Sequence, residues 1–457
     1  MIAVLTVPGN RDRVPEVRLA DNQPADLTGT TQLGAGVSVE IDLADPHRWR
    51  AVTVLDRDDA EKNLLEAVVG HESVLQLEQL RAELVSSGRD NLYADVPVET
   101  ARSGPWRRLA VIDALDRWLQ VPLDQALLDA ERAVVRARAA RTLRSTSARE
   151  HRNGQALMLA RRSAGDLSSY LTGLANSASS LPRALYSGLS RVTSGYASLA
   201  SQVVDGPDEC FDAVAEAWSR LKLVVPVGGM PLRTEHFAAD RPDSATRGSS
   251  VDPRQLRARI VDMSLQAREV RMVESPGSST VRVFVSAFNP RVPAAIADQL
   301  MVRLIDKRSG KAHEAVRLRL RSGETPVFTQ DLPLRGASID DVRADVFDPD
   351  HEMPPASTDS DDELVRRRRA QFVLSEWRRA MVEIRLSRQP KARNRRLARL
   401  ADVLSESPAD EPVFLGGPTR SEIAQYVEGR PDHPWFTSTR GAGEPLVAEL
   451  AAVHQAG

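Results

Sequence analysis

The sequence predicts a multidomain α+β protein that joins a large helical bundle or hairpin domain to an Ig-like antiparallel β-sandwich. Apolar residues recur at helical spacing through residues 59–226, and they alternate with polar residues at a period of two through residues 254–350. The segment between these patterns, 227–253, is rich in Gly, Pro, Ser and Asp and is typical of a linker. A length of 457 residues suits about three domains. The composition is 42% hydrophobic but only 4% aromatic, which predicts cores of Leu, Val and Ala.

Residues 1–58 are predicted to form a small N-terminal β segment. IAVLTV is an apolar run that ends at the turn signal PGN. In GVSVEIDL, Val37, Val39 and Ile41 alternate with polar residues, which predicts a strand with one buried face. AVTVLD is a further candidate strand.

Helices are predicted throughout residues 59–225. Gly70 separates two of them in NLLEAVVGHESVLQLEQLRAELV, and Pro105 suits the first turn of a third in GPWRRLAVIDALDRWLQ. The segment PLDQALLDAERAVVRARAARTLRSTSARE is rich in Ala and Arg, which are strong helix formers. CFDAVAEAWSRLKLVV completes the domain, and we expect Cys210 to pack there as a small hydrophobic residue.

A stretch of unusually low charge runs from Asp166 to Asp205 and has only two charged residues, Arg183 and Arg191, between its ends. It predicts two amphipathic helices, near 166–179 and 181–204. Their apolar stripe provides the candidate binding residues Leu171, Leu174, Leu181, Leu185, Leu189, Val192, Tyr196 and Leu199. The opposite faces carry Ser, Thr and Gly, which are weaker helix formers than the charged residues usual on exposed helices. Something besides solvent must therefore stabilise these helices.

Two surroundings fit this composition. In the first, the small residues let helices approach closely, so that these helices pack inside the bundle or against a partner protein. In the second, the apolar stripe inserts into packing defects of a lipid surface, with little electrostatic help. We favour protein packing, because core and oligomer helices are far commoner than membrane sensors.

Residues 254–350 contain seven candidate strands, separated by turn signals such as SPGSS, RSGK and RSGE. In TVRVFVSAF, valines alternate with Arg282 and Phe284, and EAVRLRL alternates in the same way. Seven short strands in about a hundred residues predict an antiparallel sandwich of immunoglobulin-like architecture. The paired cysteines of antibody domains are absent, so the match concerns architecture only.

An acidic linker, 351–363, leads into a basic helical C-terminal region, 364–457. The first helix of this region also carries an apolar stripe that includes Trp377 and Ile384. The candidate anion-binding residues are Arg366, Arg367, Arg368, Arg369, Arg378, Arg379, Arg395 and Arg396. They could contact the phosphates of nucleic acid or anionic lipid, or they could form a solvated face that pairs with the acidic linker. The nearby acidic residues and the net charge of −2 favour the solvated face.

The sequence lacks the common signatures of catalysis and cofactor binding. It contains neither GxxxxGK[ST] nor GxSxG, and no GxGxxG follows a predicted strand. The eight histidines are scattered, and a single cysteine excludes a zinc cluster built on several thiolates. Asp348, Asp350 and Glu352 could bind calcium weakly, but we interpret them as an acidic loop. We therefore expect no cofactor and no metal, and we lean against an enzyme. The pI of about 6.5 and the few aromatic residues argue against a nucleic-acid partner.

We expect a cytoplasmic protein from a bacterium. The single cysteine fits a reducing compartment, MIAVLTVPGNRDR lacks the features of a signal peptide, and no apolar run reaches about 18 residues. The expected role is a non-enzymatic scaffold or adaptor of a cytoplasmic assembly, which uses helices 166–204 as a helix-packing interface with protein partners or further copies of itself. The alternative is a peripheral membrane protein that inserts 166–204, while the Arg-rich helices 364–400 contact anionic lipid.

Overall fold

The structure is a computed structural model. It describes residues 2–6, 16–20, 27–34, 36–43, 46, 49–54, 59–98, 103–119, 123–178, 180–203, 208–228, 248–249, 270–274, 279–286, 299–321, 327–349, 361–386, 412, 418–427 and 444–456. The chain divides into two compact units. The first unit comprises residues 1–114, 123–234 and 376–457, and the second comprises 115–122 and 235–375. The described residues therefore show the mixed α+β class that the sequence predicts.

A six-stranded antiparallel sheet forms the N-terminal part of the first unit, with the strand order β3-β4-β5-β2-β1-β6. Its strands are β1 (Ile2–Thr6), β2 (Glu16–Ala20), β3 (Thr28–Gly34), β4 (Val37–Asp42), β5 (Trp49–Val54) and β6 (Asn91–Asp95). In β4, Val37, Val39 and Ile41 are completely buried and their polar neighbours are half-buried. The predicted strand and its buried face are confirmed.

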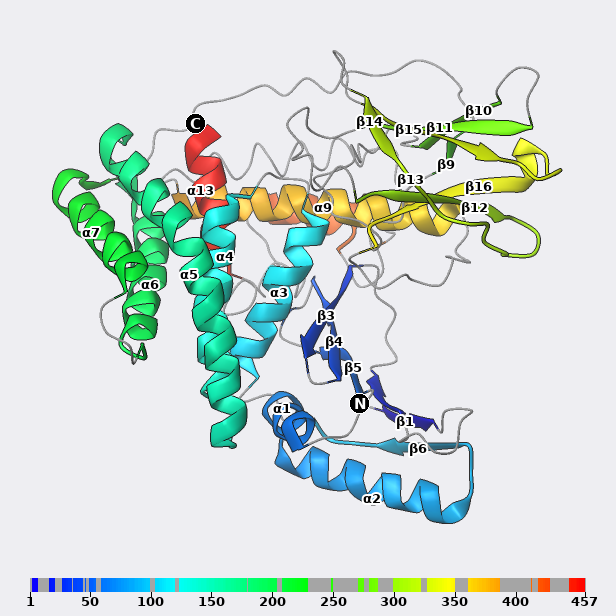
Figure 1. The fold of residues 1–457 in the computed structure, drawn as a ribbon, viewed down its shortest axis with the longest axis horizontal. Coiled ribbons are helices and arrows are strands. Elements are labelled where there is room, and N and C mark those ends of the chain that lie inside the picture. Colours follow the sequence, from blue (N-terminus) through cyan, green and yellow to red (C-terminus); the bar gives the residue numbers. More distant parts are fainter. Residues whose placement is uncertain are drawn as a thin grey trace. The chain divides into compact units, whose positions relative to one another are not determined.

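The expectation of helices throughout residues 59–225 is wrong at NLYAD. These residues form β6, which pairs antiparallel with β1 at one edge of the sheet. Helix α2 (His71–Ser87) runs alongside β6, and the Gln76 side-chain amide donates a hydrogen bond of 3.0 Å to the Asp95 carbonyl (Figure 1). A strand of five residues is too short for its period of two to stand out between long helical patterns.

Helices α1 (Asp59–Val69), α2 and α3 (Gly104–Trp118) follow the predicted boundaries closely. Gly70 separates α1 from α2 with a φ of 99°, a conformation that favours glycine. The Trp49 indole of β5 donates a hydrogen bond of 3.2 Å to the Val68 carbonyl of α1. Gly29 of β3 faces Ala114 of α3 so closely that a Cβ at Gly29 would collide with the alanine Cβ. Glycine at this position lets helix and sheet approach.

Four helices form the helical layer of the first unit: α4 (Gln125–Ala140), α5 (Thr146–Ser177), α6 (Arg183–Ala200) and α7 (Glu209–Val224). Helix α5 packs against both α4 and α7. The side chains of Asp124, Ser145 and Asp208 cap the N-termini of α4, α5 and α7, each accepting a hydrogen bond from a backbone N–H of the first turn.

The helix boundaries within residues 122–204 differ from the predicted ones. The Ala- and Arg-rich segment turns at Arg141–Thr142, and Ser145 caps a new helix, α5, that runs without interruption to Ser177. The predicted helix 166–179 is therefore the end of a longer one. The predicted helix 181–204 is α6, which is slightly shorter because Leu181–Pro182 form strand β7. Strand β7 pairs in parallel with β8 (Val227–Gly228), which follows α7.

Two antiparallel sheets make up most of the second unit. One has the order β14-β15-β11-β10-β9 and the other β13-β12-β16. The strands are β9 (Gly248–Ser249), β10 (Val270–Glu274), β11 (Thr280–Ser286), β12 (Met301–Asp306), β13 (Val316–Arg317), β14 (Arg319–Arg321), β15 (Val327–Pro333) and β16 (Val342–Phe347). Side chains of both sheets, such as Val283 and Val302, belong to one buried hydrophobic cluster. Of the predicted strands, 256–262 lies outside the described residues.

The predicted strand EAVRLRL is divided between the two sheets. Its first part, β13, pairs with β12, and its second part, β14, pairs with β15. Leu318 lies between them, is buried, and donates its backbone N–H to the Leu300 carbonyl. The alternation of apolar and polar residues continues through this crossing, so periodicity alone could not reveal it.

A long helix, α9 (Asp361–Leu386), contributes its first residues to the second unit and residues 376–386 to the first. Trp377 of its predicted apolar stripe is buried, whereas the side chain of Ile384 lies outside the described residues. The C-terminal region also contains α11 (Arg420–Val427) and α13 (Val447–Ala456). Helix α13 packs against α4 and α6 of the first unit.

Candidate functional sites in the helical layer

All eight apolar residues of the predicted binding stripe are buried inside the first unit. Leu171, Leu181, Leu185 and Leu189 are 0% exposed, and Leu174, the least buried, is 7% exposed. Val192, Tyr196 and Leu199 are equally enclosed. The stripe is therefore core of this chain, and as a surface for a partner or a membrane it is not accessible in this fold. The composition of these helices favours packing against protein over contact with lipid, and the helices that they pack against belong to the same chain.

Small residues of α6 provide the close packing. A Cβ added to Gly195 would lie 2.5 Å from two methyl carbons of Val134 in α4, and one added to Gly188 would lie 3.0 Å from Val447 in α13. The Tyr196 hydroxyl shares a hydrogen bond of 2.6 Å with the Ser163 hydroxyl of α5. Burial raises the pKa of Tyr196 to about 12.

The structure describes the side chains of four of the predicted anion-binding arginines, Arg366, Arg367, Arg378 and Arg379. Arg378 is buried and Arg379 is half-buried, and they pair with Glu449 and Glu383. Arg366 lies 3.6 Å from Glu363, the last residue of the predicted acidic linker, and Arg367 is half-buried in the same helix. The side chains of Arg368, Arg369, Arg395 and Arg396 lie outside the described residues. The described arginines therefore act mainly as ion-pair partners within the chain.

Cys210 and the predicted acidic loop of Asp348, Asp350 and Glu352 are further candidates for chemistry. The expectation that Cys210 packs as a small hydrophobic residue is wrong, because its side chain is exposed while Phe211 next to it is buried. Asp348 of the predicted acidic loop is completely buried, and Asp350 and Glu352 lie outside the described residues. Within the described ranges, no three His, Cys, Asp or Glu side chains gather to hold a metal ion. Of the helices described, none is long and apolar enough to cross a bilayer.

An exposed apolar cluster lies at the C-terminal end of α7. Leu223, Val224 and Val227 are 87%, 58% and 48% exposed. Arg220 donates a hydrogen bond of 3.1 Å to the Asn176 side chain of α5, so this end of α7 lies beside the end of α5. The β7–β8 pairing places Val227 next to Leu181. We call Leu223, Val224 and Val227 the apolar end of the helical layer.

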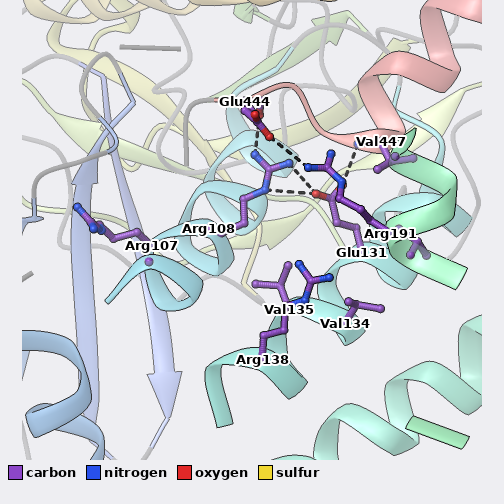
Figure 2. Close-up of a pocket in the computed structure, with 12 residues that line it drawn as sticks. Arg107, Arg108, Glu131, Val134, Val135, Arg138, Arg191, Glu444 and Val447 are labelled. Atoms are coloured by element: carbon purple, nitrogen blue, oxygen red, sulfur yellow. Dashed lines mark hydrogen bonds and ion pairs between the residues drawn. The ribbon is translucent and has the colours of Figure 1, made fainter. Parts of the chain in front are cut away.

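A cavity of about 290 Å³ opens between α3, α4, α6 and the residues that precede α13 (Figure 2). Its polar lining consists of Arg107, Arg108, Glu131, Arg138, Arg191 and Glu444, and valines of α4, α6 and α13 complete the wall. Figure 2 shows Arg108, Glu131, Arg191 and Glu444 converging, whereas the Arg107 side chain points away from them. The cavity therefore combines an apolar wall with a cluster of charged groups.

Glu131 is the centre of a buried network beside the cavity. One carboxylate oxygen accepts hydrogen bonds from Nη2 and Nε of Arg108, at 2.6 and 3.2 Å. The other oxygen accepts the backbone N–H of Val447 at 2.8 Å. Arg108 in turn donates to the carbonyls of Glu444 and Pro445. Glu131 and Arg108 thus fix the chain where α13 begins, and both charges are compensated.

A second buried pair holds the same segment from α9. Arg378 donates to both carboxylate oxygens of Glu449, each at 2.7 Å, and also to the Glu444 carbonyl. The Glu449 carboxylate also accepts a hydrogen bond from the backbone N–H of Leu446. This N–H lies at the N-terminus of α13, where backbone donors have no acceptor within the helix. Such bidentate pairs between Arg and a carboxylate are the strong, directional kind.

The remaining charges of the cavity are less well matched. Arg191 lies 3.3 Å from a carboxylate oxygen of Glu444, and both side chains are partly exposed. In the described part of the chain, no hydrogen bond or ion pair joins Arg138 to another residue. Partial burial lowers the pKa of Arg138, the like charges of Arg191 and Arg141 lower it further, and the Glu131 carboxylate partly offsets these effects. Positive charge thus accumulates on the side of the cavity that Arg138 and Arg191 line.

Sequence reasoning missed this cavity, although one signal pointed toward it. Glu131 follows Leu127 by four residues and precedes Val134 by three, so it lies on the buried face of an Ala-rich amphipathic helix. A carboxylate at such a position needs a buried partner. The partners Arg108 and Val447 are distant in sequence and could not be identified from it.

Comparison with known proteins finds no match: no family model, no curated protein and no solved structure corresponds to the chain.

Proposed function

We propose that this protein is a non-enzymatic adaptor that self-associates through the apolar end of its helical layer. The observation that carries the proposal is the exposure of Leu223, Val224 and Val227 at one end of the first unit. Clustered apolar side chains on a protein surface mark interaction sites, because their burial against a partner removes apolar area from water. Two compact units within one chain also suit a protein that links other molecules.

A second copy of the same chain is the partner that best fits this surface. The side chains of Leu223, Val224 and Val227 carry no charge, so two apolar ends can meet without charge repulsion between them. Arg220 and Lys222 flank the cluster. Arg220 donates a hydrogen bond to the Asn176 side chain, and the Lys222 ammonium lies 5.8 Å from the centroid of the Trp218 ring. They supply the polar rim that protein interfaces commonly have. A self-complementary patch of this kind suits a two-fold dimer.

The second unit offers further contact edges for an adaptor, and its strand order supports the Ig-like architecture. The strands can be lettered in chain order, with β10 as A, β11 as B, β12 as C, β14 as D, β15 as E and β16 as F. One sheet then contains the order D-E-B-A, and the other sheet contains C beside F. This is the distribution of strands A to F in an immunoglobulin constant-type domain. Exposed strand edges of such sandwiches can accept an extended peptide. The single, unpaired Cys210 supports a place in the reducing cytoplasm.

Sedimentation velocity of the intact protein over a range of concentrations tests the proposal. We expect a dimer that the double variant Leu223→Ser/Val224→Ser converts to a monomer. The matched control is Met158→Ser, which changes an exposed apolar residue of α5 that is not part of the apolar end. Circular dichroism and thermal unfolding check that each variant is folded. A monomeric intact protein, or a dimer that both variants leave unchanged, would overturn the proposal.

A further inference from the structure

The cavity beside Glu131 holds an excess of positive charge. Both oxygens of Glu131 are already engaged, one by Arg108 and one by the Val447 N–H. Glu444 offsets Arg191. Arg138 lines the same cavity and has no ion-pair partner in the described part of the chain. The protein therefore brings two guanidinium groups to the cavity, Arg138 and Arg191, and the Glu444 carboxylate is paired with Arg191 alone.

We propose that this cavity binds the phosphate group of a small molecule through Arg138 and Arg191. A guanidinium presents planar, parallel N–H donors that match the oxygens of a phosphate, and such charge-assisted bonds are stronger than neutral ones. A phosphate monoester carries about −1.5 to −2 charges at neutral pH, which matches two arginines better than a single carboxylate would. The two arginines are exposed residues of α4 and α6, and the packing of these helices against each other brings them to the same cavity.

The size and the walls of the cavity limit the rest of the ligand. A volume of about 290 Å³ lies at the lower end of the range for small-molecule sites, so it holds a compact molecule and not a polymer strand. Val134, Val135 and Val192 line the wall beside the arginines. The ligand body next to the phosphate is therefore small and at least partly apolar.

Glu444 would compete with the phosphate for Arg191. Its ion pair with Arg191 is solvent-accessible, because the two side chains are 35% and 53% exposed. Exposed pairs of this kind contribute little net free energy, so a phosphate can displace the carboxylate at small cost. The Glu444 main chain stays in place, because Arg108 and Arg378 hold its carbonyl.

Isothermal titration calorimetry with inorganic phosphate and with small organic phosphate monoesters tests this site, which is independent of the apolar end of α7. We expect Arg138→Gln and Arg191→Gln each to weaken phosphate binding by about tenfold or more, because each removes charge-assisted hydrogen bonds. Glu444→Gln should strengthen binding, because it removes the competing carboxylate. Arg183→Gln, which changes an exposed arginine of α6 outside the cavity, is the matched control and should bind normally.

Three results would overturn the proposal. The first is no heat and no thermal stabilisation with any phosphate. The second is binding that Arg183→Gln weakens as much as Arg138→Gln does, which would indicate a general charge effect. The third is binding of succinate or citrate in preference to every phosphate, which would make the site a carboxylate site. Unfolding curves of each variant establish that a loss of binding does not come from a loss of structure.

Discussion

Glu131 accepts a hydrogen bond of 2.8 Å from the backbone N–H of Val447, a residue 316 positions further along the chain. The same carboxylate neutralises Arg108, so three distant segments meet at one buried group. The first turn of α13 is thus held by a charge inside the helical layer as well as by apolar contact. This relationship makes the network around Glu131 a sensitive polar site of the first unit.

Replacing Glu131 with Ala should destabilise the first unit by about 3–5 kcal/mol, because it leaves the Arg108 charge buried without its partner. Glu131→Gln retains an acceptor for the Val447 N–H and should cost less, about 1–3 kcal/mol. Urea unfolding measures both values, and hydrogen exchange of residues 447–456 should rise more in the Ala variant. If Glu131→Gln were as stable as the native protein, the charge of Glu131 would have no structural role.

Glycine substitutions in α5 and α6 should have opposite signs. Gly195→Ala places a methyl group 2.5 Å from the Val134 side chain and should destabilise the protein by about 1–3 kcal/mol. Gly154 of α5 is exposed, and a Cβ there meets nothing within 4 Å. Gly154→Ala should therefore stabilise the helix by about 0.5–1 kcal/mol. Thermal unfolding of the two variants compares them directly, and a shift in the same direction would contradict the packing of α6 on α4.

Asp208 should make the stability of α7 depend on acidic pH. A hydrogen bond from Arg161 lowers the pKa of this carboxyl below its usual 3.8, and the Cys210 N–H adds to the effect. Because the folded-state pKa is the lower one, the stabilisation is fully present above about pH 4 and disappears as the pH falls through the folded-state value. Asp208→Asn keeps a capping oxygen but loses the charge.

The stability difference between the native protein and Asp208→Asn should therefore shrink when urea unfolding is repeated from pH 7 down to pH 3. Asp208→Ala also removes the cap and should cost about 0.5–2 kcal/mol at neutral pH. A difference between the native protein and the Asn variant that stays constant over this pH range would exclude the proposed role of the Asp208 charge.

Leu185→Asp should unfold the helical layer and not merely change its surface. Leu185 is 0% exposed, and an unpaired carboxylate in this core should cost about 4 kcal/mol or more. Ser187→Asp, on the exposed side of the same helix, should leave the protein folded. In vesicle flotation, the intact protein should not bind neutral liposomes, because the apolar stripe of α6 is enclosed. Flotation that Leu185→Asp abolishes without unfolding the protein would favour lipid insertion of 166–204 instead.

The sequence predicts local structure well where one period continues for several turns. The strand at Val37–Asp42 and the helices on either side of Gly70 follow from local spacing. The stripe from Leu171 to Leu199 is also real, but its period only shows that one face is buried, not what covers it. Spacing cannot distinguish a partner protein or a lipid from another helix of the same chain.

The features that the sequence did not predict depend on pairings between segments that are distant along the chain. Strand β6 exists because β1, about 90 residues earlier, offers an edge to it. Arg378 belongs to a run of basic residues that suggests an anion-binding face, yet its guanidinium is satisfied by Glu449 in the last helix. The cavity depends on the same kind of relationship, because Arg138 and Arg191 are brought together only by the packing of α4 against α6.

The docking of α13 on α4 and α6 also bears on how the protein is made. Helices α3 and α4 leave the ribosome long before Val447, and at about 5–20 residues per second the 316 intervening residues take roughly 16–60 s to synthesise. During that interval Glu131 and Arg108 have each other but not the segment that covers them. The nascent helical layer therefore has an open groove with exposed valines until the residues around Val447 have been synthesised, and this groove is where chaperones or premature self-association would act on the growing chain.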